Sequence, residues 1–68
     1  MAPDASADRA ELSALTTAVD ELATRVTRMT ERYSVGTRDD VLAALEDAER
    51  ALLQASRRLT VAVRTLAG

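Results

Sequence analysis

Residues Val41 to Leu66 read VLAALEDAERALLQASRRLTVAVRTL, and a seven-residue repeat organises this stretch. Leucine recurs at every seventh position, and alanine recurs at the same period, three residues after each of the first three leucines. The leucines are Leu45, Leu52, Leu59 and Leu66, and the alanines are Ala48, Ala55 and Ala62. On a helix this pattern is a heptad seam of alternating large and small side chains, and a neighbouring helix can approach closely at the alanines.

A matching repeat occupies the first half of the chain. Apolar side chains there alternate between spacings of three and four residues over three heptads, which is typical of an amphipathic helix. They are Leu12, Leu15, Val19, Leu22, Val26, Met29 and Tyr33. Between the two repeats the pattern is interrupted, with Gly36 placed for a left-handed helix cap or a turn and Thr37 placed as the N-cap of the next helix.

These signals predict a single all-α domain over residues 1–68, with one helix over about 5–33, a turn over 34–37 and a second helix over about 38–67. Pro3, Asp4 and Ser6 are the candidates to open the first helix. Because a short loop joins two helices of equal length, they should lie antiparallel, as a coiled-coil-like hairpin with a heptad seam. The expected layers are Leu15 with Leu59, Leu22 with Leu52, Met29 with Leu45, Leu12 with Ala62, Val19 with Ala55 and Val26 with Ala48.

The second helix is apolar over an arc of about 180°, which is wider than a two-helix seam needs. A hairpin alone would therefore leave Leu42, Leu53 and Val63 in water, and an uncovered apolar strip favours association through that side. The expected solution is a homodimer of hairpins that forms a four-helix bundle, and the alternative is a complex with a helical partner protein. The inferred interface residues are Leu42, Leu45, Ala48, Leu52, Leu53, Ala55, Leu59, Ala62, Val63 and Leu66.

The amino-acid composition argues against several classes of function. The 68 residues include no Cys and no His, so disulfides, the usual zinc ligands and the common nucleophile–base pairs are missing. A net charge of −2 and a single aromatic residue, Tyr33, argue against nucleic-acid binding, and no apolar run is long enough for a membrane span. We therefore expect no catalytic residue, no metal and no cofactor. The sequence favours a non-enzymatic regulatory or adaptor subunit that acts through helix–helix packing, because association is the remaining way to stabilise so short a chain.

Two groups of arginines leave a second function open. Arg25, Arg28 and Arg32 end the first helix, and the second helix ends with a similar group. That second group is Arg57, Arg58 and Arg64. In an antiparallel hairpin each group lies near the acidic start of the other helix, so mutual neutralisation is the simplest interpretation. The alternative is a site for an anion or an acidic partner, which would make the protein a ligand- or nucleic-acid-responsive regulator.

The first residues, Met1-Ala2-Pro3-Asp4, lack the basic and apolar segments of a signal peptide. The expected location is therefore the cytoplasm, with signal-independent export left open. A small secreted helical-hairpin partner protein is a further alternative, although the turn lacks the Trp-x-Gly motif of such hairpins. The two-helix plan is similar in outline to repressor-of-primer-type bundles, and this architectural likeness implies no function.

Overall fold

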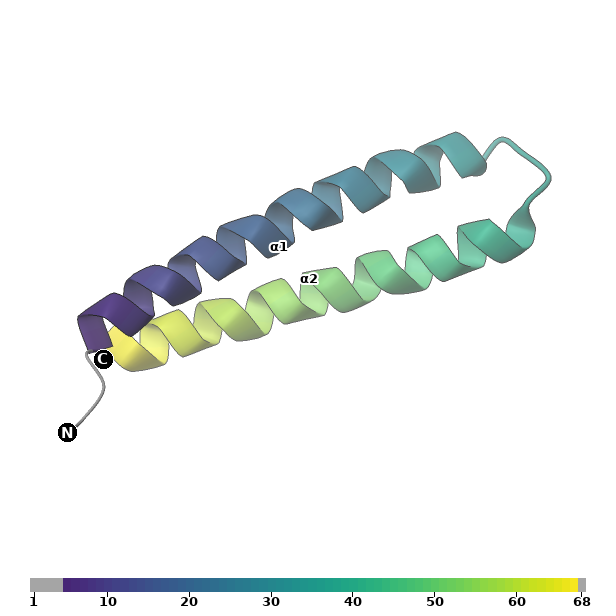
Figure 1. Cartoon of the computed structure of the whole chain (residues 1–68). Coiled ribbons are helices and arrows are strands. Elements are labelled where there is room, and N and C mark those ends of the chain that lie inside the picture. Colours follow the sequence, from purple (N-terminus) through teal and green to yellow (C-terminus); the bar gives the residue numbers. More distant parts are fainter. Residues whose placement is uncertain (1–4, 68) are drawn as a thin grey trace.

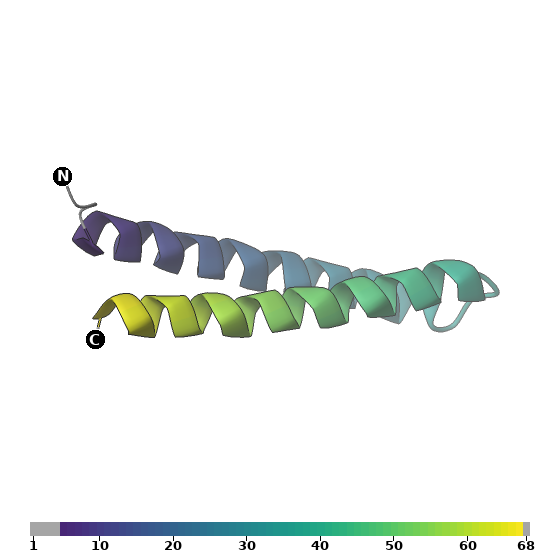
Figure 2. The same ribbon diagram turned by 90° about the horizontal axis from the view of Figure 1, so that it is seen from below.

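The computed structural model describes residues 5–67, which form two helices of equal length joined by a short turn. α1 spans Ala5–Tyr33 and α2 spans Asp39–Ala67. The helices run in opposite directions side by side, so the chain doubles back at the turn (Figure 1). A second view shows them crossing at a shallow angle (Figure 2). The predicted all-α hairpin is confirmed, whereas the predicted helix openers Pro3 and Asp4 lie outside the described residues.

The end of α1 is a tight turn without a left-handed residue. The backbone N–H of Ser34 donates to the carbonyl oxygen of Thr30 at 3.0 Å, and the N–H of Gly36 donates to the carbonyl oxygen of Tyr33 at 3.2 Å. Gly36 does not have a positive φ, so the left-handed cap predicted at this residue is wrong. The alternative prediction, that Gly36 serves a turn, agrees with its hydrogen bond to Tyr33, because such a bond closes a four-residue β-turn.

A substitution at position 36 tests this geometry. A Cβ atom there would lie 3.7 Å from the carbonyl oxygen of Tyr33, which is an ordinary van der Waals contact. We expect Gly36→Ala to raise the free energy of unfolding by about 0.4–1 kcal/mol, because alanine restricts the unfolded chain more than glycine does. Urea unfolding at a fixed protein concentration measures the change. A loss of stability of similar size would contradict the turn described here.

The start of α2 is organised by Arg38 and not by Thr37. The carbonyl oxygen of Arg38 accepts a hydrogen bond from the N–H of Leu42 at 3.0 Å, which places Arg38 at the N-cap. Its guanidinium also donates to both carboxylate oxygens of Asp40, at 3.1 Å from Nε and 3.1 Å from Nη2. This guanidinium, together with the N–H of Val41, holds the pKa of Asp40 below its ordinary value. A negative charge is thus fixed at the positive end of the helix dipole.

Two side-chain hydrogen bonds across the hairpin establish how the helices are aligned. Thr27 Oγ1 donates to Glu49 Oε2 at 2.6 Å, and Ser56 Oγ donates to Asp20 Oδ1. Seven residues separate the bonded positions in each helix, so one antiparallel register holds between them. Ala23 of α1 therefore lies at nearly the same level as residue 52 or 53 of α2.

The line of contact between the helices consists of partly or fully buried side chains. In α1 they are Leu12, Thr16, Val19, Ala23, Val26, Thr30 and Tyr33, and in α2 they are Leu42, Leu45, Glu49, Leu52, Ser56, Leu59 and Val63. Ala23 is the only buried residue among those described, with 5% of its surface exposed. The single hairpin therefore removes little apolar surface from water.

The layers predicted for α1 are wrong in one respect. Leu15, Leu22 and Met29 were expected to face α2, but their exposed fractions are 47%, 46% and 38%. Each of these residues is replaced in the seam by the next residue in sequence, so α1 is rotated relative to the predicted layers. Threonine enters the seam because its hydroxyl is satisfied locally: Thr16 and Thr30, which follow Leu15 and Met29, donate to the carbonyl oxygens four residues earlier at 2.8 Å and 2.9 Å.

The seam of α2 is also shifted. Leu42 and Val63 were predicted to stay in water in a single hairpin, and this is wrong, because the hairpin half-buries both. Leu53 does remain exposed, at 46%. Ala48, which was expected to face Val26, is exposed, while Glu49 takes the adjoining place in the seam.

Candidate interaction surface

One broad side of the hairpin carries the polar contacts between the helices, and we call it the polar side. The Thr27–Glu49 and Asp20–Ser56 hydrogen bonds lie there. Further along, Ser13, Thr16, Thr60 and Val63 line a shallow hollow between the helices. Leu53 follows Glu49 by four residues, or about one helical turn, so it projects on this side among polar neighbours. This side therefore presents exposed Leu53 and half-buried Val63 among polar side chains.

The opposite broad side is apolar along the length of the hairpin. Leu22 and Met29 follow Asp20 and Thr27 by two residues, which is about 200° around the helix, so they project away from the polar side. With Leu15 they form a column of large apolar side chains on α1. On α2 the matching column is small: Val41, Ala48, Ala55 and Ala62. We call these two columns together the apolar face.

Half-buried side chains fill the strip between the two columns. They are Leu12, Val19 and Val26 of α1 and Leu45, Leu52 and Leu59 of α2. At the end away from the turn, Leu12, Leu15 and Leu66 line a common hollow on the same side, together with Asp8 and Glu11. The apolar stripe of each helix is thus directed partly at its hairpin neighbour and partly out of the apolar face. Helices of a four-helix bundle direct their apolar stripes in this way, towards a core that lies between two layers.

The ten residues predicted as an interface separate into three groups. Most contribute to the seam or the apolar face as half-buried side chains: Leu42, Leu45, Leu52, Ala55, Leu59, Ala62 and Val63. Ala48 and Leu66 are exposed on or beside the apolar face, while Leu53 is exposed on the polar side. The Leu42/Leu53 side therefore does not form one continuous apolar strip. As an interface, the predicted set stays a prediction.

Sequence reasoning missed the exposed column on α1. It assigned Leu15, Leu22 and Met29 to the seam, because these residues continue the apolar spacing of three and four. The signal that could have found the column is the residue after each of them. Those residues are Thr16, Ala23 and Thr30, and small or hydroxyl side chains fit a close contact between helices as well as leucine does.

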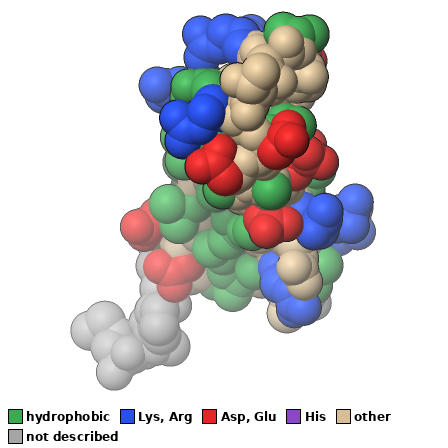
Figure 3. Space-filling view, turned by 90° about the vertical axis from the view of Figure 1, so that its right-hand side faces the viewer, with side chains coloured by type: hydrophobic (Ala, Val, Ile, Leu, Met, Phe, Trp, Pro, Cys, Tyr) green, Lys and Arg blue, Asp and Glu red, His purple; other side chains and the backbone are tan. Residues whose placement is uncertain are grey.

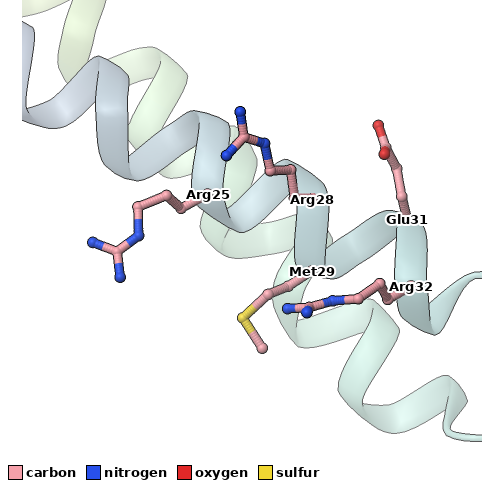
Figure 4. Close-up of a pocket in the computed structure, with 5 residues that line it drawn as sticks. All are labelled: Arg25, Arg28, Met29, Glu31 and Arg32. Atoms are coloured by element: carbon pink, nitrogen blue, oxygen red, sulfur yellow. The ribbon is translucent and has the colours of Figure 1, made fainter.

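The arginines at the end of α1 project from the helix without forming ion pairs. Among residues 5–67, ion pairs join Arg38 to Asp40 and Arg50 to Asp47, and neither pair links the two helices. Arg25, Arg28, Met29, Glu31 and Arg32 line one open hollow. Arg32 lies beside Met29, whereas Arg28 and Glu31 project on the other side of the helix (Figure 4). The view onto the turn end shows hydrophobic side chains at the surface among acidic and basic ones (Figure 3). Neutralisation between the helices therefore does not occur through direct pairing of the described charges.

Within residues 5–67, no cluster of three or more Asp and Glu side chains could hold a metal ion. Neither helix, over the same residues, combines the length and apolar character that crossing a membrane requires. No family model matches the chain significantly, and neither does any curated protein or solved structure.

Proposed function

We propose that this chain is a non-enzymatic protein–protein interaction module, a small regulatory or adaptor subunit that associates with itself through helix–helix packing into a four-helix bundle. One observation carries the proposal. The hairpin buries a single described residue, Ala23, and leaves an apolar face uncovered along its length. Soluble monomers seldom expose continuous apolar patches of this kind, and an uncovered one marks an association surface.

The size of the chain supports the same proposal. A chain of 68 residues is below the length at which one hydrophobic core gives ample stability, and this chain has no cysteine for a disulfide. Pairing two hairpins places the half-buried leucines of both copies in a common core. Self-association is therefore expected to contribute much of the stability of the folded state.

Sedimentation equilibrium tests self-association directly. We expect a species of about 15 kDa, twice the chain mass of 7.3 kDa, because two hairpins complete one bundle. The midpoint of thermal unfolding should rise with protein concentration, because dilution favours the separated and less stable chains. A chain that stays at 7.3 kDa at high concentration, with an unfolding midpoint independent of concentration, would overturn the proposal.

A second candidate function, a regulator that responds to an anionic ligand or nucleic acid, is carried by Arg25, Arg28 and Arg32. These cations have no ion-pair partner among the described residues and lie together near the turn. A thermal-shift scan against nucleotides and short DNA tests it, and a flat response would end it. The cytoplasm remains the proposed location.

A further inference from the structure

We infer that the apolar face is covered by the apolar face of a second copy, with both turns at the same end and α1 of each copy lying on α2 of the other. The inference rests on the proposed self-association and specifies its geometry. Two hairpins can stack face to face about a two-fold axis that runs along the helices or about one that runs across them. The first axis places α1 on α2 of the second copy. The second axis places like helices on each other.

The sizes of the side chains in the two columns favour the two-fold axis that runs along the helices. The register set by Asp20–Ser56 and Thr27–Glu49 places Leu22 within one residue, or about 1.5 Å, of the level of Ala55. The same register matches the other two large residues to alanines. The residues that lie at nearly the same height along the hairpin are Leu15 and Ala62, Leu22 and Ala55, and Met29 and Ala48. When α1 lies on α2 of the second copy, each large side chain therefore meets a small one.

The axis across the helices gives a poorer fit. It brings the column of large side chains on α1 of one copy onto the same column of the other copy. The column of small side chains on α2 likewise meets its own counterpart. The distance between packed helices, about 8–10 Å, depends on the side chains at the contact. The two α1 helices would be held apart while the two α2 helices could approach closely. The faces would form a wedge, and the core beneath would pack loosely.

Charge distribution favours a second copy as the occupant. α2 begins with acidic residues such as Asp39 and Asp40 and ends with a basic group that includes Arg64. α1 has the same polarity, with Asp8 in its first turn and Arg32 in its last. Any antiparallel neighbour with this polarity brings opposite charges together. A second copy supplies such neighbours for both helices at once.

The residues at the edge of the apolar face are compatible with the same arrangement. Arg25 and Arg32 follow Leu22 and Met29 by three residues, so they lie at the outer margin of the large column. By the register of the hairpin they are level with Ala51 and Ala44, which hold the matching positions on α2. In the stacked pair, these guanidiniums would therefore lie over alanines of the second copy and not against other cations.

The area of the face is sufficient for a stable dimer. The hairpin measures 55 × 18 × 14 Å, so the flat outline of its broad side is roughly 1,000 Å², whereas interfaces of standard size bury about 800 Å² of accessible surface per partner. The two helices lie side by side, so both contribute to this broad side (Figures 1 and 2).

Disulfide trapping tests the arrangement, because the chain has no cysteine of its own. Two single-cysteine chains, Leu22→Cys and Ala55→Cys, are mixed unfolded, refolded together and oxidised. We expect the mixed disulfide to exceed either self-linked product by about tenfold, since only the mixed pair lies within bonding distance across the contact. Helical content by circular dichroism confirms that each chain folds, and mass-tagged chains distinguish the products.

Exchanging the large and the small side chain at positions 22 and 55 provides an independent test, with the dimer dissociation constant as the measurement. Leu22→Ala and Ala55→Leu should each weaken dimerisation at least tenfold, and the double variant should recover to within a few-fold of the natural chain. Self-linked Leu22→Cys chains, or a double variant weaker than both single variants, would show like helices on each other and overturn the inference while self-association stands. The absence of any disulfide in a dimeric protein would also overturn it. A monomeric natural chain would overturn the proposed function itself.

Discussion

Leu22→Glu is expected to convert the assembled protein into single chains. Leu22 lies at the middle of the large column, and 46% of its surface is exposed in the hairpin. In the proposed bundle this side chain is covered by a second copy, so a carboxylate there would lose its water without gaining a partner. The dimer contains the substitution twice. We expect dimerisation to weaken by more than about 100-fold, which corresponds to about 2.7 kcal/mol.

Leu53→Glu is a matched control. The exposed fraction of Leu53 is also 46%, and the substitution is chemically the same, but this residue projects on the polar side. Glutamate and leucine have similar helix propensities, so neither variant should unfold its helix. Sedimentation equilibrium of both variants, with circular dichroism as a check on folding, compares the two sides of the hairpin. We expect Leu53→Glu to associate within a few-fold of the natural chain.

The comparison separates two interpretations of the same chain. The sequence alone favoured association on the side of Leu53, whereas in the structure Leu53 projects on the polar side, where Thr27–Glu49 and Asp20–Ser56 join the helices. If Leu53→Glu weakened the dimer more than Leu22→Glu did, association would belong to the polar side. Equal losses would show that both sides are covered, as in an assembly larger than two hairpins.

Periodicity predicts that the chain forms two helices but not how each helix is rotated about its axis. Val19 and Val26 belong to the apolar stripe in the predicted layers and in the structure alike. The difference is whether the residue three positions or four positions after Val19 completes the seam. Those residues are Leu22 and Ala23, and hydrophobicity favours Leu22. In the structure Ala23 is buried and Leu22 is exposed.

The same ambiguity affects α2. After Leu45, the choice lies between Ala48 and Glu49, and an argument from hydrophobicity selects the alanine. Glu49 occupies the seam because its carboxylate accepts a hydrogen bond from Thr27, and that bond depends on a residue of the other helix. A pattern along one helix contains no information about such a contact. The apolar stripe was therefore predictable, whereas its direction relative to the second helix was not.

The turn illustrates a related limit. Glycine between two helices is commonly left-handed, and that frequency led to the prediction at Gly36. The observed turn closes by the hydrogen bond from Gly36 to Tyr33 with a negative or extended φ, a conformation that other residues also adopt. Residue identity predicted the position of the turn, and the backbone hydrogen bonds determine its type.

Ala23→Leu is expected to lower the free energy of unfolding by about 1–3 kcal/mol. Ala23 is the one buried residue among those described, with 5% of its surface exposed, and the register places it within one residue of the level of Leu52. Three additional carbon atoms at this point would force the helices apart where they approach closely. Urea unfolding, at a concentration that keeps the protein assembled, measures the loss.

Two further variants make this prediction specific. Ala14 lies nine residues before Ala23, which is about 180° around α1, and it is exposed, so Ala14→Leu should change stability by less than about 0.5 kcal/mol. Adding Leu52→Ala to Ala23→Leu should restore part of the loss, because the large and small side chains then exchange places across the seam. If Ala23→Leu were as harmless as Ala14→Leu, the helices could not approach closely at Ala23. The rotation of α1 that exposes Leu15, Leu22 and Met29 would then be incorrect, and the apolar face would lose its large column.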